Sequence, residues 1–207
     1  MADDKPHEHV QSDYSVRAKA LVSVLTKKKL VNPATMDAVI EFYETKVGPH
    51  IGARLVARSW VDAGFRARLL ADARAVAREE QLVGLEGTDL VAVENTSRVH
   101  NLVVCTLCSC YPWTVLGLPP AWYKDSGYRA RAVIDPRGVL KEFGLELGDD
   151  VEVRVWDSTA EIRYLVLPER PPGTEGLSQD ELARLVTRDS MVGAEKLHAP
   201  AQAGKRR

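Results

Sequence analysis

The hydrophobic periodicity of this chain changes once, near Gly84 and Gly87, and that change limits the fold more than any other feature. Before it, apolar residues recur at helical spacing in four segments, which cover residues 14–31, 32–48, 53–61 and 66–80. After it, short runs rich in valine and leucine alternate with helical segments. The sequence therefore predicts an α+β protein, with an N-terminal helical arm over residues 1–80 and an α+β domain over residues 81–207.

Capping residues mark several of the expected helices. Asn32 precedes Pro33 at the start of the second segment, and Gly48 follows its end, which is the usual order at helix termini. Asp135 precedes "PRGVLKEF" and Gly144 closes it. Near the C-terminus, "SQDE" has the spacing of a capping box. These signals predict helices that begin after Asn32, Asp135 and Ser178.

Period-two alternation marks the expected strands of the second part. Two runs, residues 89–95 and 100–107, are rich in valine and leucine and are broken by polar residues. Residues 150–167 alternate on both sides of "DSTA", which predicts a β-hairpin with its turn at residues 157–160.

The helical arm has little core of its own. Four short amphipathic helices bury too little apolar surface by themselves, so we expect the arm to pack on a partner chain. Its charges do not suggest nucleic acid or a membrane surface as that partner, because 28 Lys and Arg balance 29 Asp and Glu over the whole chain. The start "MADDKPHEHVQSDYS" lacks the features of a secretory signal, and no apolar run approaches the roughly 18 residues of a membrane span. A cytoplasmic location is expected.

All three cysteines of the chain stand within six residues, in "VVCTLCSCYPW" at Cys105, Cys108 and Cys110. An odd number of thiols cannot pair completely within the chain, and a reducing cytoplasm favours free thiols or ligands. The cluster therefore indicates metal or redox chemistry, and three interpretations remain open at this point.

In the first interpretation the thiols bind zinc, with His100 completing a Cys3His tetrahedron. Structural zinc sites usually join two separated ligand pairs, however, and a single short loop crosslinks little. In the second, the CxxC pair is a redox dithiol, which requires a cysteine at a helix N-terminus. Pro112 and the preceding valine run make that placement doubtful.

In the third interpretation an octahedral low-spin metal is held by thiolates and by main chain. The sulfur and backbone nitrogen of Cys110 close a five-membered chelate ring, and the nitrogens of Ser109 and Cys110 close another. The sulfur of Cys108 and the nitrogen of Ser109 close a six-membered ring. Cys105 is then the axial thiolate, and the opposite position stays open, as in catalytic metal sites. Amide ligands require a charge-dense ion such as Co(III) or low-spin Fe(III).

The cysteine motif and its surroundings resemble the α subunit of nitrile hydratase, specifically the cobalt type. The resemblance covers residues 16–192 and is carried by "VCTLCSCYPW", "LGLPPAWYK", "DPRGVL", "RVWDSTAEIRY", "LPERPPGTE" and "LVTRDSM". It implies a layered α/β/β/α catalytic domain over residues 81–207. It also implies three sulfur ligands from Cys105, Cys108 and Cys110, and amide ligands from Ser109 and Cys110. Thr106, where iron-type members usually have serine, implies Co(III) rather than Fe(III), one ion per chain.

The resemblance further implies an activity, which is the hydration of a small-molecule nitrile to the corresponding amide. Cys108 would be oxidised to a sulfinic acid and Cys110 to a sulfenic acid, and the attacking oxygen would come from activated water or from the Cys110 sulfenate. His100 is then a structural histidine, because the ligand set is already complete.

Further site residues follow from the resemblance alone. Asp157 and Glu161 would lie near the cysteine loop and order water or hold an arginine, although without the resemblance they are better explained as turn residues of an exposed hairpin. Trp113 would line the pocket wall. Glu86 stands nineteen residues before Cys105, where family members often have glutamine, and a carboxylate there adds negative charge beside an anionic ligand set.

The resemblance also implies partners: a β subunit in an αβ or α2β2 assembly, whose arginines bind the oxidised sulfurs, and an activator protein that loads cobalt. No nucleic acid or membrane partner is expected. Two alternatives remain. The γ subunit of thiocyanate hydrolase shares the "CTLCSC" core, although Trp113 stands where that relative is expected to have arginine. A non-catalytic zinc-binding module is the second.

Overall fold

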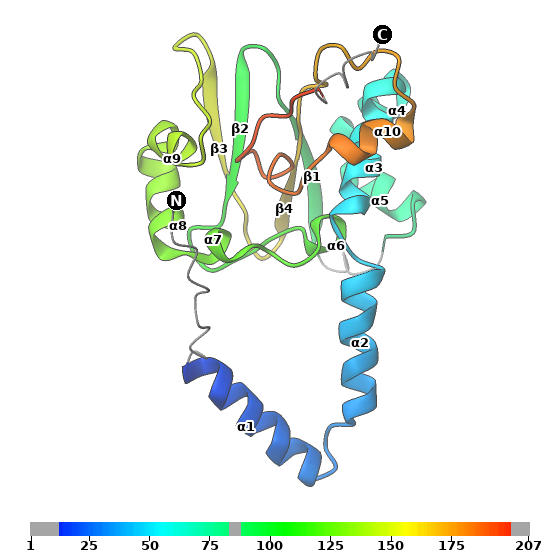
Figure 1. The fold of residues 1–207 in the computed structure, drawn as a ribbon, viewed down its shortest axis with the longest axis vertical. Coiled ribbons are helices and arrows are strands. Elements are labelled where there is room, and N and C mark those ends of the chain that lie inside the picture. Colours follow the sequence, from blue (N-terminus) through cyan, green and yellow to red (C-terminus); the bar gives the residue numbers. More distant parts are fainter. Residues whose placement is uncertain (1–12, 83–87, 200–207) are drawn as a thin grey trace, which may run out of the picture. The chain divides into compact units, whose positions relative to one another are not determined.

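The computed structural model describes residues 13–82 and 88–199 of the chain (Figure 1). They belong to two compact units, of which the first ends at Tyr43 and the second begins at Glu44. Within these described ranges, no helix is long and apolar enough to cross a bilayer.

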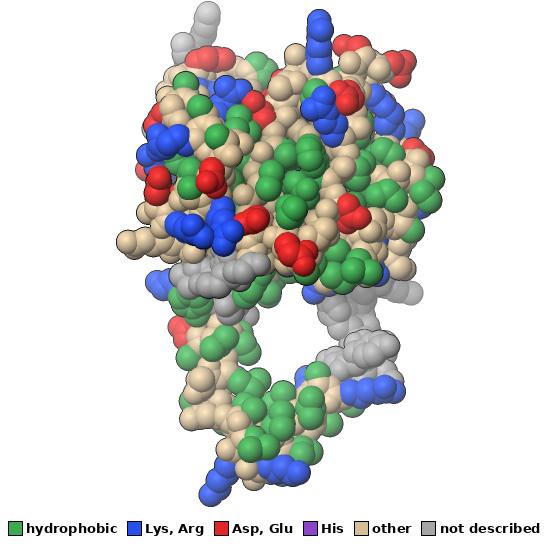
Figure 2. Space-filling model, turned by 180° about the vertical axis from the view of Figure 1, so that it is seen from behind, with side chains coloured by type: hydrophobic (Ala, Val, Ile, Leu, Met, Phe, Trp, Pro, Cys, Tyr) green, Lys and Arg blue, Asp and Glu red, His purple; other side chains and the backbone are tan. Residues whose placement is uncertain are grey.

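The first unit holds two helices, α1 (Asp13–Lys27) and most of α2 (Pro33–Thr45). The side chain of Asn32 accepts a hydrogen bond from the Ala34 N–H at 3.0 Å, so the predicted start of α2 is confirmed. Hydrophobic side chains cover much of the surface of these helices (Figure 2). The large exposed hydrophobic residues of this unit are Val16, Leu21, Val22, Val24, Leu30, Val39, Ile40 and Phe42. Packing of the arm on a partner stays a prediction.

The second unit is built on two sheets of two parallel strands each. Strand β1 (Asp89–Glu94) pairs with β4 (Ile162–Leu167), with Asp89 opposite Ile162. Strand β2 (Val99–Val104) pairs with β3 (Glu152–Asp157), with Val104 opposite Asp157. Each pair therefore joins strands from distant parts of the sequence.

The predicted β-hairpin around "DSTA" is wrong, although both of its strands exist. β3 and β4 lie in different sheets, and neither pairs with the other. The Ser158 N–H donates to the Val104 carbonyl at 2.7 Å, and the Thr159 N–H donates to the Ile162 carbonyl at 3.0 Å. The turn thus carries the chain from one sheet to the other. Period-two alternation shows which side chains face the core, but it does not identify the neighbouring strand.

Helices cover the outer face of each sheet, as Figure 1 shows. On the β1–β4 side lie α3 (Pro49–Val61), α4 (Ala63–Ala71) and α5 (Ala73–Glu79), with α10 (Gln179–Leu185) packed on α3. On the β2–β3 side lie α8 (Ser126–Ile134) and α9 (Pro136–Glu142). Two one-turn helices, α6 (Trp113–Leu116) and α7 (Ala121–Lys124), follow the cysteines. The expected α+β class with its α/β/β/α layers is confirmed.

The boundary between the units lies earlier than the expected boundary at residue 80. Helices α3, α4 and α5 contribute Val56, Phe65 and Val76 to the same core as the strands, and all three side chains are almost completely buried. The break at Asp62 agrees with the gap between the expected segments 53–61 and 66–80, whereas a second break at Asp72, whose side chain caps α5 through the Ala75 N–H, was not predicted. The arm that has no core of its own is therefore α1 and α2.

The caps predicted at Asp135, Gly144 and Ser178 are confirmed, whereas Gly48, which was predicted to close α2, is the N-cap of α3. The side chain of Asp135 accepts a hydrogen bond from the Gly138 N–H at 2.9 Å, and Gly144, which follows α9, has φ of +81°. Ser178 and Glu181 form the expected capping box at the start of α10.

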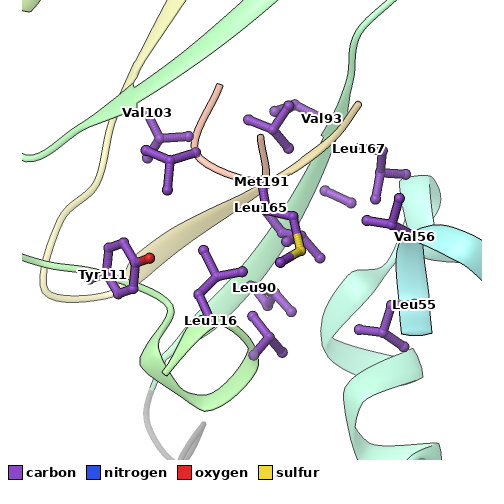
Figure 3. Packing of buried hydrophobic residues seen from close by; sticks show 14 of the residues in the cluster. Leu55, Val56, Leu90, Val93, Val103, Tyr111, Leu116, Leu165, Leu167 and Met191 are labelled. Carbon is purple, nitrogen blue, oxygen red and sulfur yellow. The ribbon is translucent and has the colours of Figure 1, made fainter. Parts of the chain in front are cut away.

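A C-terminal segment, residues 190–193, joins the two sheets. The Val192 carbonyl accepts from the Val103 N–H on β2 at 2.9 Å, and the Met191 carbonyl accepts from the Val166 N–H on β4 at 3.0 Å. Met191 points into the core beside Leu165 and Leu116 (Figure 3). Gly193 has φ of +88°, and a Cβ there would lie 1.8 Å from the Asn101 carbonyl oxygen. Only glycine fits this close approach.

His100 is buried and fully hydrogen-bonded in this core. Its Nε2 lies 2.7 Å from the Gly193 carbonyl, which can only accept, so Nε2 carries the proton. Its Nδ1 lies 3.3 Å from the Asn95 amide nitrogen. Burial lowers the pKa of His100, although the bond to Gly193 opposes this effect. The prediction that His100 is structural is consistent with these contacts.

We expect His100 to make the folded protein sensitive to acid. Because its folded-state pKa lies below its unfolded-state value, the unfolded chain binds more protons as pH falls through that ordinary value of about 6.5. The stability it contributes is present above this pH and is lost below it. Urea unfolding at pH 8 and pH 5.5 should show a smaller loss of free energy of unfolding in His100→Gln than in wild type. His50→Gln, at an exposed position, is the control. Equal losses in the wild type and the His100 variant would contradict this.

Candidate metal centre

The three cysteines lie together in a loop that directly follows β2, called here the cysteine loop (residues 105–110). The Cys108 sulfur lies 3.5 Å from the Cys105 sulfur and 3.2 Å from the Cys110 sulfur, and all three lie within 4.8 Å of one another. Cys105 is completely buried, Cys110 is half-buried and Cys108 is exposed. The loop therefore presents one buried thiol below two more accessible ones, and none of them forms a disulfide.

Backbone nitrogens of the cysteine loop face the same sulfur. Hydrogen bonds from the Cys110 thiol, the Cys105 thiol and the Ser109 N–H, in that order of size, lower the pKa of Cys108 to about 7, and the Cys110 N–H contributes further. The Cys108 N–H in turn lies 3.3 Å from the Cys105 sulfur. The main-chain N–H groups of Ser109 and Cys110 thus both stabilise the thiolate form of Cys108, which is compatible with the chelate interpretation.

The spacing of the sulfurs can be compared with two coordination geometries. Thiolates about 2.3 Å from a metal stand about 3.3 Å apart at a right angle and about 3.8 Å apart at a tetrahedral angle. The separation of 3.2 Å between Cys108 and Cys110 is close to the right-angle value, whereas the 3.5 Å between Cys105 and Cys108 lies midway between the two values. Both ring nitrogens of His100 are hydrogen-bonded, Nε2 to the Gly193 carbonyl and Nδ1 to the Asn95 amide. His100 is therefore not free to complete a Cys3His zinc site. The donor set fits an ion held by sulfur and main chain.

Three side chains from outside the loop fix its backbone. Asp157, at the end of β3, accepts from the Thr106 N–H at 2.9 Å and from the Thr106 hydroxyl. Arg129 on α8 donates to the Cys108 carbonyl at 2.8 Å. The hydroxyl of Tyr123 on α7 donates to the Cys110 carbonyl at 2.8 Å. The conformation of the loop is therefore set at its beginning, middle and end.

A cavity of about 350 Å³ opens beside the sulfurs. It is lined by Cys108, Ser109, Cys110, Tyr111, Trp113, Leu118, Pro119 and Arg163. Its volume is in the range of small-molecule sites, and its walls are largely apolar. Burial, followed by the hydrogen bond with Cys108, raises the pKa of Cys110, and the positive charge of Arg163 opposes this rise. Arg163 therefore brings this chain's own positive charge to the cavity.

The expected site residues differ in whether they line the cavity, contact the cysteine loop or do neither. Trp113 begins α6 and lines the cavity. Asp157 contacts the cysteine loop, but it holds Thr106 rather than an arginine. Glu161 lies exposed in the turn before β4, where its carboxylate accepts from the Thr159 hydroxyl at 3.0 Å. Glu86 falls outside the described residues. The catalytic roles of these residues stay predictions.

Arg129, Tyr123 and Arg163 were missed by sequence reasoning. Arg163 has a weak signal, since it is a charge within the otherwise mainly apolar strand "IRYLVL". Arg129 has no such signal, because "GYRARAVI" contains two arginines and nothing in the sequence distinguishes them. Their positions depend on which helix packs beside the loop, which local patterns do not encode.

The fold and the loop together define a class of protein, one with a sulfur-rich metal centre at the end of a parallel strand pair in an α/β/β/α domain. Comparison with known sequences then identifies the family. Residues 12–195 match the family model described as nitrile hydratase, alpha chain. The chain belongs to this family.

Individual relatives agree with this assignment. The chain is 53% identical, over 92% of each sequence, to the low-molecular weight cobalt-containing nitrile hydratase subunit alpha of Rhodococcus rhodochrous. It is 37% identical to thiocyanate hydrolase subunit gamma of Thiobacillus thioparus, over 88% of this chain and 79% of that one. A double mutant of the Fe-type nitrile hydratase from Comamonas testosteroni Ni1 superimposes with a TM-score of 0.85 at 38% identity, covering 93% of this chain and 97% of that one.

We expect Asp157 to protect the start of the cysteine loop. In Asp157→Ala the Thr106 N–H loses its acceptor, so its hydrogen exchange, followed by NMR, should become about tenfold faster. Asp135→Ala is the matched control, because Asp135 also accepts a backbone N–H but lies at the start of α9. That variant should affect Gly138 and leave Thr106 unchanged. Unaltered exchange at Thr106 in Asp157→Ala would show that Asp157 does not hold the loop.

Proposed function

We propose that this chain is the α subunit of a cobalt nitrile hydratase, which hydrates a small-molecule nitrile to the corresponding amide. The observation that carries the proposal is the convergence of three thiols and two backbone nitrogens beside a small-molecule cavity, in a chain that belongs to the nitrile hydratase α family. The 53% identity with a cobalt-containing relative favours Co(III) over Fe(III).

The residues that would hold the ion are those of the cysteine loop. Cys105, Cys108 and Cys110 offer sulfur, and Ser109 and Cys110 offer main-chain nitrogen. When bound, the ion supplies Lewis acidity that polarises a nitrile or acidifies water. The proposal includes oxidation of Cys108 to a sulfinic acid and of Cys110 to a sulfenic acid. The more accessible positions of these two thiols, compared with the buried Cys105, support this order of oxidation.

The residues of this chain perform the remaining tasks of the reaction. Asp157 and Tyr123 hold the two ends of the loop, so its sulfurs do not move when substrate enters. Trp113 and Leu118 form an apolar wall that suits the hydrocarbon part of a nitrile. Arg163 places positive charge beside oxygen atoms on the oxidised sulfurs. Glu86 and Glu161 are retained as proposed site residues.

Exposed apolar side chains in the cysteine loop and at the cavity wall support a β subunit as the partner. Leu107 in the cysteine loop is 89% exposed, and Leu118 at the cavity wall is 61% exposed. Large apolar side chains at this level of exposure mark an interaction surface when they lie together beside a site. Within the first unit, the exposed apolar residues of α1 and α2 suggest a second contact. We propose an αβ or α2β2 assembly, loaded with cobalt by an activator protein in the cytoplasm.

Activity should therefore require both subunits. The chain coexpressed with its β subunit and supplied with cobalt should hydrate nitriles, whereas the chain alone should be inactive because the proposed site is shared with β. Amide release is the measurement, and thiocyanate is offered as the competing substrate. Hydrolysis of thiocyanate without nitrile turnover would instead identify a thiocyanate hydrolase, which 37% identity keeps as the second candidate. Full nitrile turnover by the chain alone would contradict the shared site.

The ligand set should be visible by intact mass and elemental analysis. The complex should contain one cobalt per α chain, with two added oxygens on Cys108 and one on Cys110. Cys108→Ala and Cys110→Ala should each abolish activity, because each removes a sulfur of the loop. Zinc with three unmodified thiols in a complex without nitrile turnover would support the non-catalytic module instead. Near-normal turnover in either variant would contradict the assignment of these ligands.

A further inference from the structure

Arg129 makes an unusual contact for a surface arginine. Its Nη1 donates to the carbonyl oxygen of Cys108 at 2.8 Å, and it forms no ion pair with any residue in the ranges 13–82 and 88–199. Its Nε is buried and has no hydrogen-bond partner among those residues. Arg131, two residues further along α8, instead forms a bidentate pair with Glu142. A guanidinium whose only visible partner is a neutral carbonyl lacks a counter-charge.

The Cys108 carbonyl belongs to the same peptide group as the Ser109 nitrogen. In a planar trans peptide the C=O bond and the N–H bond point in opposite directions. Arg129 holds the oxygen on one side, so the Ser109 N–H is directed to the opposite side of the peptide. Fixing the oxygen therefore fixes the direction of the nitrogen.

The position of Arg129 is itself fixed by the fold. Its neighbour Tyr128 is buried, and the Tyr128 hydroxyl donates to the Val103 carbonyl on β2 at 2.5 Å. The N-cap Asp125 holds the first turn of α8 through the Tyr128 N–H at 3.0 Å. The start of α8 is thus attached to the strand that leads into the cysteine loop. A group supported in this way keeps its geometry when a ligand binds.

We infer that Arg129 is a positioning residue for the metal-binding peptide: it turns the Ser109 nitrogen toward the metal position and balances the negative charge that this peptide carries as a ligand. Amide resonance shares that charge between the nitrogen and the Cys108 oxygen. The oxygen then accepts a charge-assisted hydrogen bond from the guanidinium, which is stronger than a neutral one. The counter-charge that Arg129 lacks is supplied by the loaded loop. This inference rests on the proposed function only for the binding of cobalt.

The test uses the αβ complex purified from cells grown over a graded series of cobalt concentrations. Cobalt per α chain is measured by elemental analysis, together with the position of the thiolate-to-cobalt absorption band per bound cobalt. In Arg129→Gln we expect the cobalt concentration for half occupancy to rise about tenfold, as for the loss of one charge-assisted hydrogen bond. We also expect the band of the cobalt that remains bound to shift, because the Ser109 nitrogen is no longer held in place.

The matched control is Arg131→Gln, which removes an exposed arginine from the same helix and should leave both readouts at wild-type values. A purely structural role for Arg129 would reduce the amount of cobalt and leave its band unchanged, and this outcome would overturn the inference. Unchanged half occupancy and an unchanged band in Arg129→Gln would overturn it as well.

Arg129→Lys keeps the charge without the planar fork, so we expect a band close to the wild-type position and a half occupancy between those of wild type and Arg129→Gln. If Arg129→Gln does not assemble with β, Arg129→Lys is compared with Arg131→Lys, and wild-type values for both readouts in Arg129→Lys would then refute the inference. Neither readout uses nitrile turnover. A wild-type complex that binds cobalt but is inert toward nitriles would refute the proposed function and leave the result for Arg129 intact.

Discussion

The parallel pairing of β2 with β3 is the constraint on which the metal centre depends. Its register sets Val104 opposite Asp157, so the last residue of one strand lies beside the carboxylate that ends the other. The cysteine loop begins at the next residue after Val104, and Asp157 holds the N–H of its second residue, Thr106. A shift of one position in this register would turn Asp157 to the opposite face and leave the loop without its first contact. The site is thus a continuation of the sheet.

The loop is held mainly through its backbone. Asp157 binds an N–H, whereas Arg129 and Tyr123 bind carbonyl oxygens, and none of these three contacts involves a cysteine side chain. This leaves all three sulfurs free to face the same point. It also means that the ligands of such a centre are oriented by residues outside the loop, from the neighbouring helices α7 and α8 and from strand β3, which follows them in the sequence.

The parts of this structure that sequence reasoning predicted are those decided by neighbouring residues. The caps at Asn32, Asp135 and Ser178 depend on bonds within one helical turn, and the grouping of the thiols depends on six consecutive residues. The hairpin prediction failed because alternation in "EVRVWD" and "IRYLVL" records burial but not the strand alongside. The assignment of α3–α5 to the arm failed for the same reason, because the apolar face of a helix does not show which surface it packs against. The contacts of Arg129 and Tyr123 with the loop were not predicted, because only the packing of α7 and α8 brings these residues to the loop.

The segment at residues 190–193 has a consequence for biosynthesis. Because it bonds to β2 and β4 and closes the space between the two sheets, the core cannot be completed until almost the entire chain has left the ribosome. Both strand pairs also form late, because Asp89 pairs with Ile162 and Val99 pairs with Glu152, and both partners are synthesised much later. The thiols are synthesised well before the partners that bury Cys105 and hold Thr106. During that interval nothing buries Cys105 or fixes the loop, so the finished arrangement of the three sulfurs can form only after most of the chain has been synthesised.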